Sequence, residues 1–135
     1  MKNTISMPTL LQTRTIQLQG DYAEGFEGYP VYQFMAVYSS MVKIFRMWEG
    51  WFDGIIQEVL PQCNGWTSLA LVYHTDKGWF ENSPWPIREP KAAIEQLKST
   101  YSRLPSSEHV SICAQLIDFL IQSLEEGAEL YIGYD

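Results

Sequence analysis

Histidine and cysteine, whose side chains often serve as bases, nucleophiles and metal ligands, occur only twice each in this chain. His74 and Asp76 lie at the predicted end of a strand, where alternate side chains point to the same face. A carboxylate beside an imidazole raises the pKa of the ring and supports acid or base catalysis. His74 and Asp76 are therefore the candidate catalytic pair, although Asp76 is also typical of a simple exposed turn.

Other catalytic and metal-binding patterns are weaker. Cys63 would act as a nucleophile beside His74 only if the intervening turn folded back, and no third catalytic residue is indicated. The chain has no Cys-x-x-Cys or His-x-x-x-His pair and no calcium-loop spacing of carboxylates. Gly25 and Gly28 enclose an acidic residue and precede a strand, whereas a phosphate loop precedes a helix. We therefore expect no metal and no cofactor.

The cysteine and hydropathy patterns bear on the compartment. Cys63 and Cys113 are far apart in the sequence, which favours reduced thiols over a disulfide framework unless the fold brings them together. No stretch of about eighteen apolar residues is present, and the N-terminal apolar pair is too short for a signal sequence. We expect a cytoplasmic protein that does not enter a membrane.

Charge is distributed unevenly along the chain. Nine Lys and Arg against sixteen Asp and Glu give a formal net charge of -7, which disfavours binding to nucleic acid. The segment 104–135 has no basic residue, and Glu125 and Glu126 oppose the dipole at the end of a predicted helix. Its acids are Glu108, Asp118, Glu125, Glu126, Glu129 and Asp135. This pattern predicts an anionic surface that attracts a basic partner, or simply a solvated face that keeps the protein soluble.

Aromatic residues make up 14% of the chain and include five tryptophans. We expect Trp79, on a short edge strand, and Trp85, between two prolines, to be exposed. Exposed tryptophans are frequent anchors of protein interfaces, although here they could instead fold over the core as a lid. Trp48 and Trp66 are assigned to the core.

We expect a single domain spanning 1–135 to position all of these candidate residues, since two domains of half this length would be hard to stabilise. Alternating apolar residues predict strands at 14–18, 31–37 and 129–134 and a hairpin over 66–81. Helical spacing predicts helices over 41–60, from Pro90 to about 104, and from about 106 to a stop at Gly127. The expected fold is α+β, a mainly antiparallel sheet with about three helices on one side.

Two of these helices carry specific expectations. In the first, Gly50 and Gly54 each cost roughly 1 kcal/mol relative to Ala, which indicates close packing or a bend as compensation. In the last, Ser106 or Ser107 caps the N-terminus. Its apolar residues, beginning with Val110 and Cys113, are expected to form the most buried stripe of the protein.

In size, acidity and aromatic content the chain resembles the small acidic immunity proteins of bacteria, which neutralise a cognate toxin, often a basic nuclease. The resemblance extends to no sequence motif, and it implies a stoichiometric protein-binding module. From the residues themselves, the contributors we expect are Trp79, Trp85, Glu125, Glu126, Glu129 and Asp135. One alternative is a small enzyme or ligand-binding domain with a pocket near His74 and Asp76. Another is a homo-oligomeric structural subunit whose exposed tryptophans bury one another.

Overall fold

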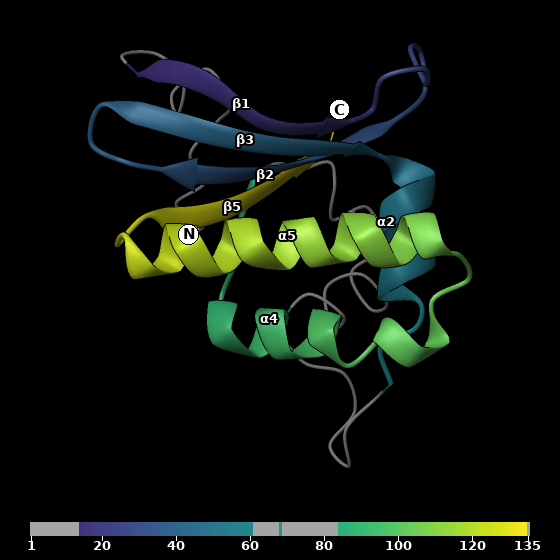
Figure 1. Ribbon diagram of the computed structural model, residues 1–135. Helices are drawn as coiled ribbons and strands as arrows, with labels where there is room; N and C mark the ends of the chain where they lie inside the picture. The colour runs from purple at the N-terminus through teal and green to yellow at the C-terminus, as the bar shows by residue number, and fades with distance from the viewer. Residues whose placement is uncertain (1–13, 61–67, 69–83, 135) are drawn as a thin grey trace, which may run out of the picture.

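The computed structural model describes residues 14–60, 68 and 84–134 (Figure 1). In this part of the chain the strands are β1 (Thr15–Tyr22), β2 (Val31–Val37), β3 (Met41–Trp48), β4 (Trp85–Pro86) and β5 (Glu129–Tyr134). The α-helices are α2 (Glu49–Ile56), α4 (Pro90–Lys98) and α5 (Ser107–Glu125), and the 3-10 helix η2 spans Tyr101–Arg103.

The strands form one sheet in the order β1-β3-β2-β5-β4. β1 runs parallel to β3, and the other neighbouring pairs are antiparallel. The helices lie on one side of the sheet, with α5 between the sheet and α4 (Figure 1). The predicted α+β architecture, with a mainly antiparallel sheet and three helices, is therefore confirmed.

The predicted long helix over 41–60 is wrong at both ends, because residues 41–48 form β3 and α2 ends at Ile56. The side chains of Phe45 and Met47 face the helices, whereas Val42 and Ile44 belong to a cluster on the opposite face. A strand with apolar residues on both faces loses the alternation that marks a strand, so its sequence also fits a helical period. Hydrogen bonding to β1 on one edge and β2 on the other decides the outcome.

The predicted positions of the other strands and helices agree better with the structure. β2 and β5 have their expected bounds, whereas β1, predicted over 14–18, continues to Tyr22 and lies at the edge of the sheet. Pro90 is the first residue of α4, and the Ser106 side chain accepts a hydrogen bond of 3.2 Å from the His109 N–H. Gly127 follows α5 with a φ of 80°. The predicted hairpin over 66–81 lies outside the described residues.

Close packing compensates for the two glycines of α2, as predicted. A Cβ at Gly50 would collide with the Trp48 ring, and a Cβ at Gly54 would lie 2.5 Å from the His109 Nε2. Gly54 therefore allows α2 to approach the first turn of α5.

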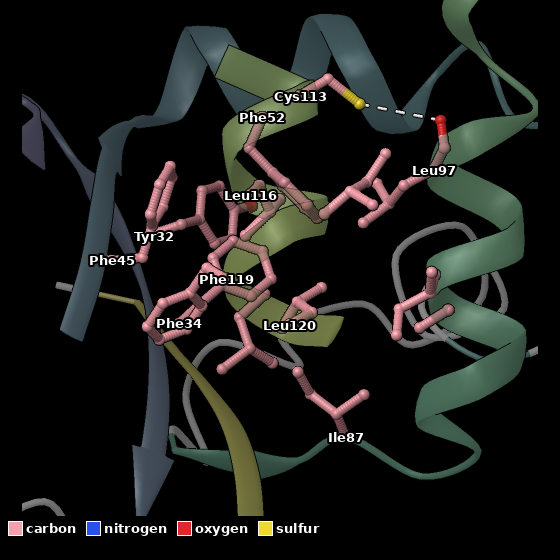
Figure 2. Close-up of a cluster of buried hydrophobic side chains, with 14 of the residues drawn as sticks. Tyr32, Phe34, Phe45, Phe52, Ile87, Leu97, Cys113, Leu116, Phe119 and Leu120 are labelled. Atoms are coloured by element: carbon pink, nitrogen blue, oxygen red, sulfur yellow. Dashed lines mark hydrogen bonds between the residues drawn. The ribbon is translucent and has the colours of Figure 1, made fainter. Parts of the chain in front are cut away.

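The main hydrophobic core fills the space between the sheet and the helices (Figure 2). The strands contribute Tyr32, Phe34 and Phe45, and the helices contribute Phe52, Leu97, Leu116, Phe119 and Leu120. Cys113, a buried free thiol, lies 3.7 Å from the carbonyl oxygen of Leu97 and is positioned to donate to it. Burial raises the pKa of this thiol to about 11. Cys113 is therefore a packing residue and not a reactive one.

The buried face of α5 differs from the predicted stripe at its first turn. It is centred on Leu116 and Leu120, whose side chains are 0% and 1% exposed. Val110 lies at the margin of this face and is 36% exposed. The rotation of α5 about its axis, set by packing on the sheet and α4, places Val110 toward solvent.

This difference predicts unequal effects of two substitutions in α5. Leu116→Ala should lower the free energy of unfolding by about 2–5 kcal/mol, because it leaves a cavity in the core. Val110→Ala should cost less than about 1 kcal/mol, because its side chain is partly solvated already. Urea denaturation followed by circular dichroism measures both. Equal losses would contradict the orientation of α5.

Candidate functional site

A surface pocket of about 760 Å³ lies where β1 and β3 end, β2 begins and β5 ends. The loop that joins β1 to β2 forms much of its wall. Its lining residues are Asp21, Ala23, Glu24, Phe26, Glu27, Gly28, Tyr29, Pro30, Val31, Gln33, Arg46 and Tyr134. Carboxylates and aromatic rings therefore dominate its side-chain chemistry.

Two successive turns shape the loop. The Asp21 Oδ1 accepts a hydrogen bond of 3.0 Å from the Ala23 N–H, and the Ala23 carbonyl accepts one from the Phe26 N–H. The Phe26 carbonyl then accepts a hydrogen bond from Tyr29. Gly25 and Gly28 have φ values of 91° and 88°, which glycine adopts at the third position of such turns without steric cost.

An aromatic stack fastens this loop to the rest of the protein. The rings of Phe26 and Trp48 lie parallel, with centroids 4.2 Å apart. Trp51 contacts both rings edge to face, and its other neighbour is His109 at 5.0 Å. Trp48, which the sequence assigns to the core, is only half-buried and supports the loop instead. Phe26 is thus the apolar anchor that holds the pocket wall.

The pocket carries more negative than positive charge. Three carboxylates, of Asp21, Glu24 and Glu27, face a single guanidinium, that of Arg46. The Nε of Arg46 lies 3.3 Å from the Asp21 Oδ1, an ion pair without the alignment of a hydrogen bond. Backbone N–H groups of Glu27 and Gly25 lower the pKa of the Glu27 carboxyl. Glu27 is therefore a fixed anion, unsuited to exchanging protons near neutral pH.

Tyr134 closes the pocket at the end of β5. Its hydroxyl donates a hydrogen bond of 2.5 Å to the Glu49 Oε2, and its ring meets Tyr32 edge to face. Burial, and then the neighbouring Glu49 carboxylate, raise the pKa of Tyr134 to about 12. The phenol consequently stays protonated and acts as a structural donor.

The predicted acidic residues occupy the opposite end of β2 and β5. Glu125, Glu126 and Glu129 lie around the turn that joins α5 to β5. Glu126 accepts a hydrogen bond of 2.6 Å from the Tyr38 hydroxyl and lies 3.8 Å from the Lys43 Nζ. Glu129 accepts one from the Tyr131 hydroxyl. The turn gathers three carboxylates, although Lys43 offsets part of their charge.

The remaining predicted site residues are Trp85 and four residues outside the described part of the chain. Trp85 was expected to be exposed, but it pairs with Ile132 as part of the short edge strand β4 and is half-buried against the main core. Its proposed role as an interface anchor stays a prediction. His74, Asp76, Trp79 and Asp135 lie outside the described residues, and so does the pocket predicted near the first two.

Gly25 and Gly28 of this loop were considered only as a phosphate-binding pattern, and the pocket was not predicted from the sequence. The signal was the combination of Glu24 and Glu27 with the aromatic residues Phe26 and Tyr29. Arg46 lies in the segment 41–60 that was predicted to be a helix, so its position beside Asp21 became visible only once β3 paired with β1.

Residues 14–60, 68 and 84–134 contain no group of three His, Cys, Asp or Glu side chains that could hold a metal ion. None of the helices found there is long and apolar enough to cross a membrane. No protein-family model, curated protein or solved structure matches this chain.

The aromatic stack predicts a different role for each of two aromatic residues of the loop. Phe26→Ala should free the loop and accelerate proteolytic cleavage within residues 21–30, because the contacts with Trp48 and Trp51 are lost. Tyr29→Ala is the matched control, since that side chain is 63% exposed. Limited proteolysis with mass spectrometry measures both. Equal cleavage of the two variants would show that Phe26 does not anchor the loop.

The raised pKa of Tyr134 predicts a loss of stability in alkali. The unfolded chain releases this phenolic proton near pH 10, whereas the folded protein keeps it to about pH 12. The stabilising effect is complete below pH 10 and is lost as the pH rises through this interval. Urea denaturation at pH 9 and 11 should show a smaller decline for Tyr134→Phe than for the original protein. An identical decline would contradict the assignment.

Proposed function

We propose that this chain is a stoichiometric protein-binding module that captures a basic partner. The observation that carries the proposal is the acidic, aromatic-lined pocket where β1 and β3 end and β2 begins. Its shape and charge suit a lysine or arginine side chain projecting from another protein.

The charges of the pocket support binding better than catalysis. Asp21 is paired with Arg46, which leaves Glu24 and Glu27 without an ion pair among the described residues. Because the pKa of Glu27 is lowered, its charge persists at neutral pH and below. A permanent anion at the surface attracts a cationic side chain and fixes its position.

The rings of the pocket supply the second part of the recognition. Tyr29 is 63% exposed and therefore available to a partner without rearrangement of the core. A guanidinium or ammonium group is attracted to the face of an aromatic ring, and the attraction grows as water is excluded. Carboxylates beside such rings thus favour cationic side chains over neutral ones.

Charge outside the pocket would help the partner to approach. The formal net charge of -7 attracts a basic protein from beyond contact distance. We propose that Glu125, Glu126 and Glu129 contribute to this steering from the α5–β5 turn. Their local bonds to Tyr38 and Tyr131 hold two of these carboxylates in place.

A finer proposal concerns the identity of the partner. The resemblance of the chain to small acidic immunity proteins makes a basic toxin, such as a nuclease, our proposed target. We also place the protein in the cytoplasm, where a free buried thiol like that of Cys113 is ordinary. Neutralisation then requires only that the bound module block the surface that the toxin uses.

The decisive experiment compares two double variants with the same change in charge. Glu24→Gln with Glu27→Gln alters the pocket, whereas Glu95→Gln with Glu108→Gln alters exposed positions on α4 and α5. A partner captured from the native source is identified, and its association rate is measured by stopped flow at 50 and 500 mM salt. We expect a one-to-one complex whose association slows at least about tenfold in high salt.

The pocket variant should bind at least about tenfold more weakly than the control variant, because it lacks the two unpaired carboxylates. Equal affinities of the two variants would overturn the role of the pocket. An association rate independent of salt would overturn the electrostatic basis of the proposal.

A further inference from the structure

The outer edge of β1 is an unusual surface for a soluble protein. Figure 1 shows β1 along the margin of the sheet, beside β3. The side chains of residues 15–19 are all exposed, and Ile16 and Leu18 each expose 52% of their surface. Edge strands are usually protected from further pairing by lysine, proline or short length. β1 has eight residues and neither lysine nor proline.

The backbone of β1 shows which groups face outward. The Thr15 N–H donates to the Ser40 carbonyl at 3.0 Å, and Thr15 pairs with Met41 of β3. In a parallel pair, the N–H and C=O of one residue point to the same neighbour, and those of the next residue point away. The N–H and C=O groups of Ile16 and Leu18 therefore point away from β3, toward the open edge.

We propose that this edge is an interface between two copies of the chain, joined by antiparallel pairing of their β1 strands. A two-fold axis at Gln17 would place Ile16 opposite the partner's Leu18, and Leu18 opposite the partner's Ile16. These pairs exchange four backbone hydrogen bonds, because both residues present a donor and an acceptor. The joined strands would make one continuous sheet across the two copies.

The side chains fit this register as well as the backbone does. Ile16 and Leu18 pair with Val42 and Ile44 of β3, so they lie on the face opposite the helices. Pairing at the two-fold axis would bring the four exposed aliphatic side chains of two copies together on that face. Such cross-strand apolar pairs stabilise antiparallel strands and favour this register over its neighbours.

A second copy suits this edge better than the basic partner does. Residues 15–19 are uncharged, so they offer nothing to attract a cation and no repulsion to a second copy. The register shift between Leu18 and Gly20 ends the regular part of the strand and limits pairing to this segment. An interface this short is far below the area of a permanent dimer, so we infer a weak one that forms at high concentration.

The proposed dimer does not rest on the proposed function, and the two interactions should respond to salt in opposite directions. Two copies with a net charge of -7 repel each other at a distance, and salt screens the repulsion. Self-association should therefore strengthen in salt, whereas capture of a basic partner should weaken. Failure of one behaviour leaves the other intact.

The test is sedimentation velocity over a range of protein concentrations in 50 and 500 mM salt. We expect a monomer–dimer equilibrium whose association is stronger in high salt. Ile16→Lys with Leu18→Lys should weaken it at least about tenfold, because like charges would face each other across the strands. Ser111→Lys with Gln122→Lys, at exposed positions of α5, adds the same charge and should leave the dimer intact.

A milder variant and a local measurement keep the test decisive even if the lysine variant misfolds. Ile16→Thr with Leu18→Thr keeps good strand-forming residues and should also weaken the dimer. Hydrogen exchange at rising concentration should slow at the amides of Ile16 and Leu18. The inference is overturned by a monomer at every concentration and salt, or by a dimer that resists both β1 variants. Unchanged exchange at these two amides upon dimerisation would overturn it equally.

Discussion

The structure depends first on the pairing of β3 with strands on both of its edges. β1 lies on one side and β2 on the other, so β3 is hydrogen-bonded along both of its edges. This pairing carries Phe45 and Met47 into the main core and brings Arg46 beside Asp21. Among the described strands, it also leaves β1 with a bonded neighbour on one edge only. Core, pocket and outer edge are thus consequences of a single strand's position.

The two ends of the sheet have different chemistry. At one end, Phe26 stacks on Trp48 and holds an acidic loop over the ends of three strands. At the other, the turn after α5 gathers carboxylates that are bonded to tyrosines and offset by Lys43. The first end combines unpaired charge, exposed rings and a concave shape. The proposed function therefore rests on this end, although the sequence drew attention to the second.

The two proposed interactions of the protein use separate surfaces and different forces. Recognition of a basic partner relies on long-range charge and on a pocket for one cationic side chain. Pairing of two copies relies on backbone hydrogen bonds and aliphatic contacts at an uncharged edge. Since Tyr22 at the end of β1 adjoins the pocket loop, a dimer would present two acidic pockets within one continuous sheet. Such an arrangement would allow a partner with two basic sites to bind both.

Local patterns along the chain determined β2, β5 and the starts of α4 and α5, because these depend on alternation, proline and a capping serine, whereas α4 ends at Lys98 and not near residue 104. The acidity and the glycine turns of the pocket loop were also visible in the sequence. The identity of residues 41–48 as a strand was decided by pairing with β1 and β2, since apolar residues on both faces satisfy either period. The pocket likewise needed the tertiary structure, because Arg46 and Tyr134 reach it from strands distant in sequence. Hydrogen bonding between distant strands is a property of the folded chain that no local window contains.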